Sequence, residues 1–150
     1  MINRRHIRVK VMQSVYAFLQ SNSDILDKEE KFLYNSIDKM NDLYVLILQL
    51  FIEVKNMEKN HMKISKKKIL ATAKELNPNK KFINNSVFKM LEESISLNEH
   101  VESKKLNYWI FDDEYVKEIW KLTKESDLYI DFVKTEESSF KDDKEFVLEW

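Results

Sequence analysis

The sequence contains no glycine, no cysteine and a single proline in 150 residues. Without glycine, the chain cannot form the glycine-rich loops that bring backbone amides close to a nucleotide phosphate. It also lacks the residue that most hairpin turns and helix ends use for positive φ angles. The absence of cysteine excludes disulfides, thiolate zinc sites and a cysteine nucleophile. Together these absences favour an all-α protein.

What the sequence does contain is typical of a folded chain. Hydrophobic residues make up 43% of it, aromatic residues 12% and charged residues 34%. This length and composition suit one domain, or two small helical halves, with long solvated helix faces.

Apolar residues recur at helical spacing in the first half of the chain. A stripe in residues 3–20 predicts a first helix with Asn3 as its N-cap; its residues are Ile7, Val11, Val15, Phe18 and Leu19, with Met12 at the border. Residues 27–61 predict a long second helix with a seam at Leu33, Ile37, Met40, Tyr44, Ile47, Phe51 and Val54. The seam permits a dimeric coiled coil, but its widened middle favours burial by other helices of the same chain. The apolar run 43–52 is too short to span a bilayer.

The second half predicts shorter helices. We expect them over residues 66–76, 86–98, 113–125, 128–133 and 142–150. Pro78 marks the firmest break, so residues 1–76 and 77–150 form the predicted segments, packed together as one domain. Asparagine is expected to take the left-handed conformation where helices end, at Asn22, Asn60, Asn77, Asn79 and Asn98. Either the last helix docks through Trp150, or the chain is truncated there. The predicted architecture is an all-α helical bundle with a long second helix.

Charge is segregated along the chain, although the net charge is only −1. All three arginines lie at positions 4, 5 and 8, and the other 22 basic residues are lysines. Guanidinium groups make bidentate contacts to phosphate and stack on bases, whereas lysine acts as a point charge. Arg4 and Arg8 lie one helical turn apart and share a face, and Tyr16 follows two turns later. This arrangement predicts binding to single-stranded RNA.

Other functional patterns are weaker. The lysine-rich segment 63–81 would extend an RNA-binding surface, but a solvated role is favoured. The histidines His6, His61 and His100 are too dispersed to predict a metal site. The acidic runs 112–114 and 142–143 would suit a metal-dependent nuclease, yet acids at helix starts are the better explanation. We therefore expect no cofactor and no catalysis. The alternative to RNA binding is a protein-interaction adaptor that dimerises or binds a partner through the seam of the second helix.

The pattern Arg4-Arg5-x-x-Arg8-x-x-x-x-Gln13-x-x-Tyr16 resembles the opening helix of the NusB family of bacterial transcription antitermination and ribosome-biogenesis factors. The likeness covers about 20 residues, and departures from the family pattern fall at His6, Ile7, Lys10 and Val11. The rest of the chain resembles a NusB variant with a long insertion after the first helix, in which a second helical bundle follows roughly where this chain ends.

The resemblance implies a function. NusB proteins pair with the ribosomal protein NusE and bind boxA RNA within the RNA polymerase complex that transcribes ribosomal RNA operons. Carried over by position, Arg4, Arg5 and Arg8 would touch RNA, with His6, Lys10, Gln13 and Tyr16 as further candidates. Gln13 and Tyr16 are equally compatible with structural roles. A cytoplasmic protein without a membrane partner is expected, and a homodimer is left open.

Overall fold

The computed structural model describes residues 3–21, 25–69, 72–135 and 137–150, apart from the side chains of residues 73 and 74. Every regular element in these ranges is a helix, so the predicted all-α class is confirmed. The helices are α1 (Arg4–Ser21), α2 (Leu26–Lys66), α3 (Ala73–Leu76), α4 (Ser86–Glu92), α5 (Ile95–Lys104), α6 (Tyr108–Phe111), α7 (Asp113–Glu125), α8 (Asp127–Phe132) and α9 (Phe140–Glu149).

Contacts divide the chain into two compact units. The hairpin unit, Met1–Ile47, contains α1 and the first part of α2, and the core unit, Leu48–Trp150, contains the remainder. The division lies inside α2, whereas the sequence placed a boundary at residues 76–77, which fall within the core unit. The sequence segments 1–76 and 77–150 both contribute side chains to the core described below.

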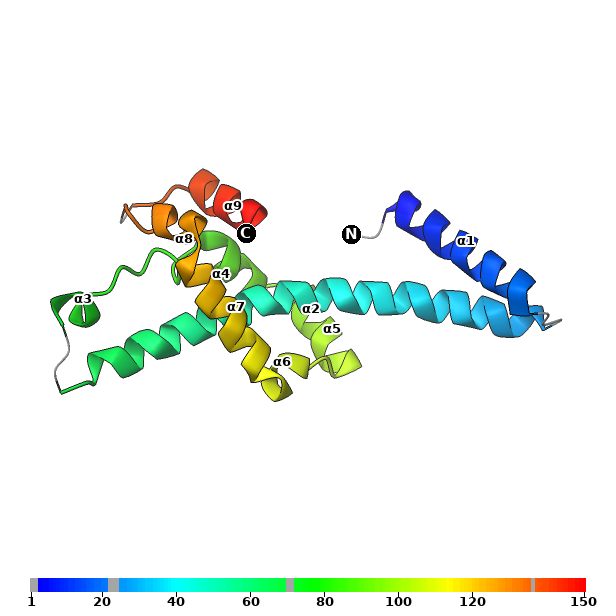
Figure 1. Cartoon of the computed structure of the whole chain (residues 1–150), viewed down its shortest axis with the longest axis horizontal. Coiled ribbons are helices and arrows are strands. Elements are labelled where there is room, and N and C mark those ends of the chain that lie inside the picture. The colour runs from blue at the N-terminus through cyan, green and yellow to red at the C-terminus, as the bar shows by residue number, and fades with distance from the viewer. Residues whose placement is uncertain (1–2, 22–24, 70–71, 136) are drawn as a thin grey trace. The chain divides into compact units, whose positions relative to one another are not determined.

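The hairpin unit consists of two helices that run in opposite directions and diverge from their connection (Figure 1). The side-chain Oδ1 of Asn3 accepts a 3.0 Å hydrogen bond from the backbone N–H of His6, which confirms Asn3 as the N-cap of α1. This bond satisfies one of the amide groups that a helix start leaves unpaired. The cap therefore stabilises the first turn of α1, which carries Arg4 and Arg5.

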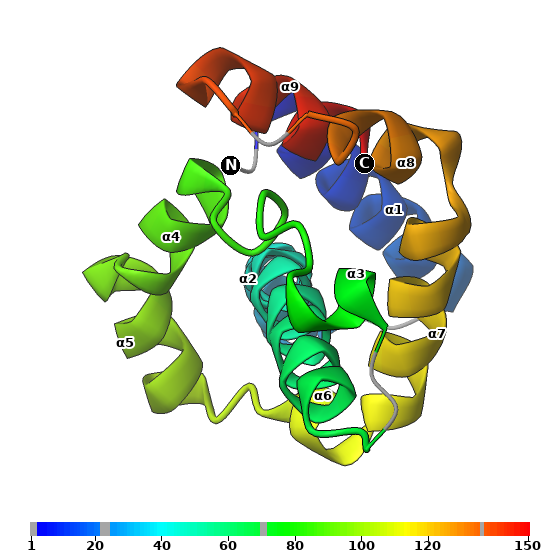
Figure 2. The same cartoon turned by 90° about the vertical axis from the view of Figure 1, so that its left-hand side faces the viewer.

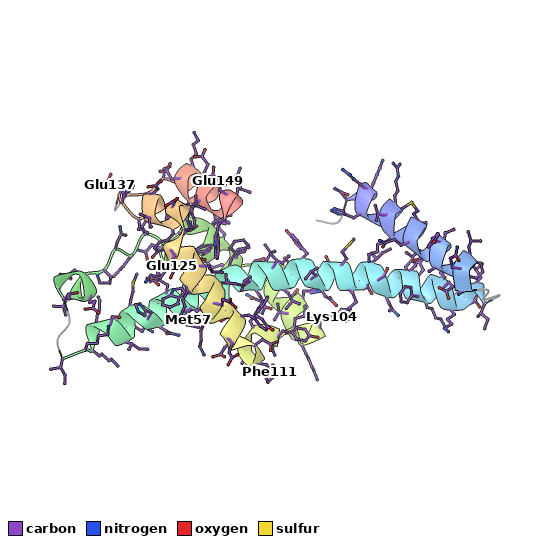
Figure 3. The ribbon with its side chains drawn as sticks, viewed as in Figure 1. Met57, Lys104, Phe111, Glu125, Glu137 and Glu149 are labelled. Atoms are coloured by element: carbon purple, nitrogen blue, oxygen red, sulfur yellow. The ribbon has the colours of Figure 1, made fainter. Side chains whose placement is uncertain are left out.

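In the core unit, several helices surround the second part of α2. Figure 2 shows α4 and α7 on opposite sides of α2, while α8 and α9 lie close to each other. The buried side chains of this core are Val54, Phe82, Phe88, Val116, Tyr129 and Phe146. Met57, labelled in Figure 3, packs against them from α2. Val54, at the C-terminal end of the predicted seam, is completely buried. This part of the seam therefore packs against other helices of the same chain.

Aromatic rings fill much of this core. The ring of Phe82 lies edge-on to those of Phe88 and Tyr129, with centroids 5.2 and 5.3 Å apart. Trp150 packs edge-on against Phe51 of α2 at 4.8 Å. The last helix therefore docks through Trp150, which is one of the two outcomes predicted from the sequence.

A buried carboxylate joins α4 to α9. Asp143, which is 5% exposed, accepts hydrogen bonds from the N–H and hydroxyl of Ser86 at 2.8 and 2.6 Å, and from the Ser138 hydroxyl at 2.6 Å. Asn85 is fully buried, caps α4 through its Oδ1, and donates its Nδ2 hydrogen to the Asp143 carbonyl at 3.2 Å. These bonds satisfy polar groups that would be costly to bury alone.

Three predictions of local structure were wrong. The segment 66–76 is not one helix, because α2 continues to Lys66 and only residues 73–76 form the next. The segment 86–98 forms two helices, because Ser94 is extended and serves as the N-cap of α5. Among the described residues the left-handed conformation is taken by Lys105, with φ 54°, and not by an asparagine; Asn22 lies outside them.

Candidate nucleic-acid interface

The three arginines lie in the first turns of α1 and are exposed. Helix α1 contains no acidic residue. No carboxylate in the described ranges forms an ion pair with Arg4, Arg5 or Arg8. An exposed cation that has no internal partner attracts an external anion at little cost, because no ion pair must first be broken.

Helical geometry places two of these arginines in line with exposed apolar side chains. At 3.6 residues per turn, positions 4, 8, 12, 15 and 19 fall on one face of α1. We call this face the outer stripe; its residues are Arg4, Arg8, Met12, Val15 and Leu19. Arg5 and Tyr16 flank it on the same side. The apolar members are strongly exposed: Met12 is 65%, Val15 52% and Leu19 68% exposed.

The outer stripe belongs to an open, largely apolar surface. Its residues all come from α1, namely Ile7, Arg8, Val11, Met12, Val15, Tyr16 and Leu19. Arg8 and Tyr16 therefore border the same surface, as the sequence predicted for a cation and an aromatic ring two turns apart. Tyr16 is 65% exposed, so its ring face is accessible to a planar ligand.

A different face of α1 is turned to α2. Val11, Ser14, Val15 and Phe18 line a groove of about 370 Å³ together with α2 residues that include Leu26 and Leu33. Ser14 is the buried residue of α1 and Phe18 is half-buried. The predicted apolar stripe is thus wider than the contact with α2. The sequence showed which residues are apolar, but not that Met12 and Leu19 would remain uncovered.

The remaining predicted site residues lie elsewhere around α1. His6, Lys10 and Gln13 fall on the side of the helix opposite the outer stripe, by the same helical geometry. His6 and Gln13 are exposed and Lys10 is half-buried. A ligand on the outer stripe would therefore meet Arg4, Arg5, Arg8 and Tyr16 together, and would not reach the other three at the same time.

The lysine-rich segment does not form a second uniform basic surface. Lys68 donates a 2.7 Å hydrogen bond to Glu75. That bond, with two more from Thr72, lowers the pKa of Glu75 to about 2. Lys81 is 8% exposed, donates to the Thr135 hydroxyl at 2.7 Å and lies 4.4 Å above the ring of Phe132. Both lysines therefore make contacts within the chain, Lys68 with Glu75 and Lys81 with Thr135 and Phe132.

The acidic runs also have structural roles. Asp113 and Glu114 lie in the first turn of α7, and Asp113 pairs with Lys117 one turn later. Asp142 forms a capping box with Ser139, whose N–H and hydroxyl lower the pKa of that carboxyl. Both acidic runs therefore lie at helix starts, as the sequence predicted. Across the described ranges, no three side chains of histidine, aspartate or glutamate gather as metal ligands.

None of the helices, so far as the described residues extend, is both long and apolar enough to cross a membrane. In comparisons with protein-family models, with curated proteins and with solved structures, the chain matched none.

Proposed function

We propose that this chain binds single-stranded RNA through the arginine end of the outer stripe, as an antitermination factor of the NusB type. In this proposal it acts in the cytoplasm, with NusE, on boxA-like RNA within the RNA polymerase antitermination complex. The supporting observation is the set of three exposed guanidinium groups without a carboxylate partner among the described residues. The resemblance of residues 4–16 to the NusB opening helix supplies the identity of the RNA and of the protein partners.

The chemistry of the outer stripe suits a single strand better than a duplex. Guanidinium groups at one end would contact successive phosphates, while bases would stack on Tyr16 or pack against Met12 and Leu19. In a duplex the bases are paired and cannot reach an aromatic ring on a convex helix. Three phosphate contacts give modest affinity, so a second protein that shares the RNA, such as NusE, is physically expected.

The adaptor alternative has less support than it had from the sequence. Phe51 and Val54 of the predicted seam pack in the core unit, so the seam is not free along its length. Tyr44 and Ile47, further toward the N-terminus, are 43% and 46% exposed. The other three seam residues, Leu33, Ile37 and Met40, are half-buried, so the seam is not a continuous exposed face along α2.

Fluorescence anisotropy tests the proposal directly. A labelled single-stranded RNA with a boxA-like sequence is titrated with the native chain and with Arg4→Ala/Arg8→Ala, with and without NusE. We expect the double substitution to weaken binding by about tenfold or more, since each lost charged contact contributes roughly 1 kcal/mol. Circular dichroism should show unchanged helicity, because both side chains are exposed.

A matched control is Lys121→Ala/Lys144→Ala, which removes the same charge from exposed positions on α7 and α9. If this lysine pair weakens RNA binding as much as the arginine pair does, the binding is diffuse and the outer stripe is not the site. A duplex of the same sequence should bind less tightly than the single strand.

A further inference from the structure

A pocket of the core unit lies where the segments that lead into α4 and α9 meet. It has a volume of about 580 Å³ and is open to solvent. Pockets of this size are typical of small-molecule sites. One wall consists of residues between 78 and 86, and the other of residues between 138 and 143. Both walls belong to the core unit.

Lys81 brings a buried positive charge to this pocket. Its side chain is 8% exposed, and its ammonium donates to the Thr135 hydroxyl at 2.7 Å and lies 4.4 Å above the Phe132 ring. No carboxylate in the described ranges forms an ion pair with it. A buried charge is costly without a counter-ion. An ammonium has three N–H groups, so Lys81 keeps a donor for a ligand.

Two acids in the first turn of α9 lie near this charge but do not pair with it. Asp143 lines the pocket, and its carboxylate accepts hydrogen bonds from Ser86 and Ser138. Asp142 is held in the capping box by Ser139, which lowers its pKa more than the charge of Lys81 does. The charge of Lys81 is therefore left for an external anion.

Other groups of the pocket add donors and an apolar wall. Lys80 is exposed and, like Lys81, has no ion-pair partner in the described part of the chain. The exposed side-chain amide of Asn84 forms no hydrogen bond to the described residues, so its N–H groups are available. The ring of Phe140 is 57% exposed and, with Pro78, supplies apolar surface.

We propose that this pocket binds a small molecule that carries a phosphate group. The phosphate oxygens accept from Lys80 and Lys81, and the rest of the molecule lies against Phe140 and Pro78. A phosphate monoester has three acceptor oxygens and about −1.5 to −2 charge at pH 7, which two ammonium groups match better than they match a carboxylate. An RNA strand needs a groove that follows its backbone, whereas this pocket is built from two short segments.

Calorimetric titration of the full chain in a phosphate-free buffer tests this proposal. The probes are inorganic phosphate, adenosine monophosphate and acetate. We expect phosphate to bind at least about tenfold more tightly than acetate, and adenosine monophosphate to bind more tightly still because its base contacts Phe140. If neither phosphate compound binds at up to about 10 mM, the proposal is overturned. Acetate that binds as tightly as phosphate overturns the choice of a phosphate.

Substitution of Lys81 distinguishes a binding role from a structural one. Lys81→Met keeps the length and burial of the side chain but removes its charge, so phosphate affinity should fall at least about tenfold. Without ligand, this variant should melt no lower than the native chain, because the ammonium that it removes has no counter-ion. A lower melting temperature with unchanged phosphate affinity would show that Lys81 is structural, and would overturn the proposal.

Exposed lysines provide a second test that does not disturb the core. Lys80→Ala should weaken phosphate binding severalfold, whereas Lys121→Ala, an exposed position on α7, should bind phosphate like the native chain. Equal losses in the two variants would mean that phosphate is attracted by general charge and not by the pocket. Arg4→Ala/Arg8→Ala should also retain phosphate binding, and a loss in this variant would place the phosphate on α1.

Binding at this pocket is independent of the proposed RNA function and can fail separately. A chain that binds adenosine monophosphate in the pocket, but shows no preference for single-stranded RNA, would overturn only the RNA-binding proposal. Conversely, Lys80→Ala and Lys81→Met might be found to weaken RNA binding while adenosine monophosphate does not bind. That result would make the ligand of this pocket an RNA strand and would overturn the small-molecule proposal.

Discussion

The indole Nε1 of Trp120 donates a 2.7 Å hydrogen bond to the buried carboxylate of Glu58, which joins α7 to the C-terminal part of α2. Lys124, one turn after Trp120, lies 3.3 Å from the same carboxylate. The Trp120 ring also lies against the ring of His61 of α2, tilted by 52° with centroids 4.9 Å apart. A single acidic side chain, 3% exposed, thus gathers partners from a helix more than 60 residues away in the sequence.

Removing this carboxylate should destabilise the core unit. Glu58→Ala leaves the Trp120 N–H and the Lys124 ammonium without their acceptor, and we expect a loss of about 2–4 kcal/mol in the free energy of unfolding. Urea unfolding followed by tryptophan fluorescence measures the loss. The control is Glu102→Ala on α5, an exposed position where the change should stay within about 0.5 kcal/mol. Equal effects at the two positions would mean that the Glu58 bonds contribute nothing specific.

Tyr129 predicts a loss of stability at alkaline pH. Burial, followed by the charge of Glu58 and a hydrogen bond to it, raises the pKa of the Tyr129 hydroxyl well above its usual value of 10. Above pH 10 the unfolded chain therefore releases this proton while the folded chain keeps it, so the free energy of unfolding falls as pH rises. The contribution is at most about 1.4 kcal/mol per pH unit. Below pH 10 it is fully present.

The difference between the native chain and Tyr129→Phe isolates this effect from the titration of lysines. Unfolding in urea is measured for both chains at several pH values from 8 to about 11.5. We expect the native chain to lose stability more steeply than Tyr129→Phe above pH 10. Parallel curves for the two chains would show that the folded-state pKa of Tyr129 is not raised.

Asn85 should contribute more than an ordinary helix cap. Its side chain accepts hydrogen bonds from the N–H groups of Val87 and Phe88 at 2.9 and 3.4 Å, and it also donates to the Asp143 carbonyl. Replacement by alanine would lose the cap and leave buried groups unpaired, at a cost of about 2–3 kcal/mol. Thermal unfolding would reveal the effect. Ser139→Ala, at the exposed capping box of α9, should cost only about 1 kcal/mol.

The salt dependence of RNA binding should show how many phosphate contacts the arginines make. With three phosphate contacts on a single strand, log K against log salt concentration should have a slope of about −2. Replacing Arg4, Arg5 and Arg8 together by lysine keeps the charge, so the slope should persist while affinity drops because bidentate contacts are lost. Replacing all three by alanine should bring the slope toward zero. An unchanged slope in the alanine variant would place the phosphate contacts elsewhere.

Substitutions of Tyr16 distinguish the contribution of base stacking to RNA affinity from that of the phosphate contacts. Tyr16→Ala should weaken binding of single-stranded RNA by roughly 1–3 kcal/mol and leave the salt slope unchanged, because stacking involves no counterion release. Tyr16→Phe, which keeps the ring, should bind nearly as well as the native chain. Anisotropy titrations at two salt concentrations measure both effects. If Tyr16→Phe is as weak as Tyr16→Ala, the hydroxyl rather than the ring makes the contact.

The sequence was sufficient for the helices whose apolar spacing is long and regular. Helix α1 and most of α2 follow from that spacing, and Asn3 was recognised as a cap from its residue type and position. Helix ends were harder to predict, because Ser94 interrupts an apolar pattern that continues at helical spacing from Val87 to Ile95. A break of this kind depends on how α4 and α5 pack, which a one-dimensional pattern does not contain.

The candidate site was only partly predictable. The arginines were found because they differ from the lysines in the rest of the chain. The exposure of Met12 and Leu19 was not foreseen, because apolar spacing shows that a face is apolar but not whether a neighbour covers it. Glu58 and Asp143 were likewise missed as organising groups. A buried acid is recognisable only when the donors around it, which come from distant parts of the sequence, are brought together by the fold.

The left-handed residue Lys105 has a consequence for a chain that contains no glycine. A side chain in this conformation strains the backbone by about 1–2 kcal/mol, and glycine would relieve that strain. Glycine would also give the unfolded polypeptide more freedom, which opposes folding by roughly 0.5–1 kcal/mol. The second effect offsets about half of the first, so lysine at the end of α5 has a net cost of about 0.5–1 kcal/mol. Because the chain has no glycine, its unfolded state is less flexible. This lower flexibility offsets part of the backbone strain at Lys105.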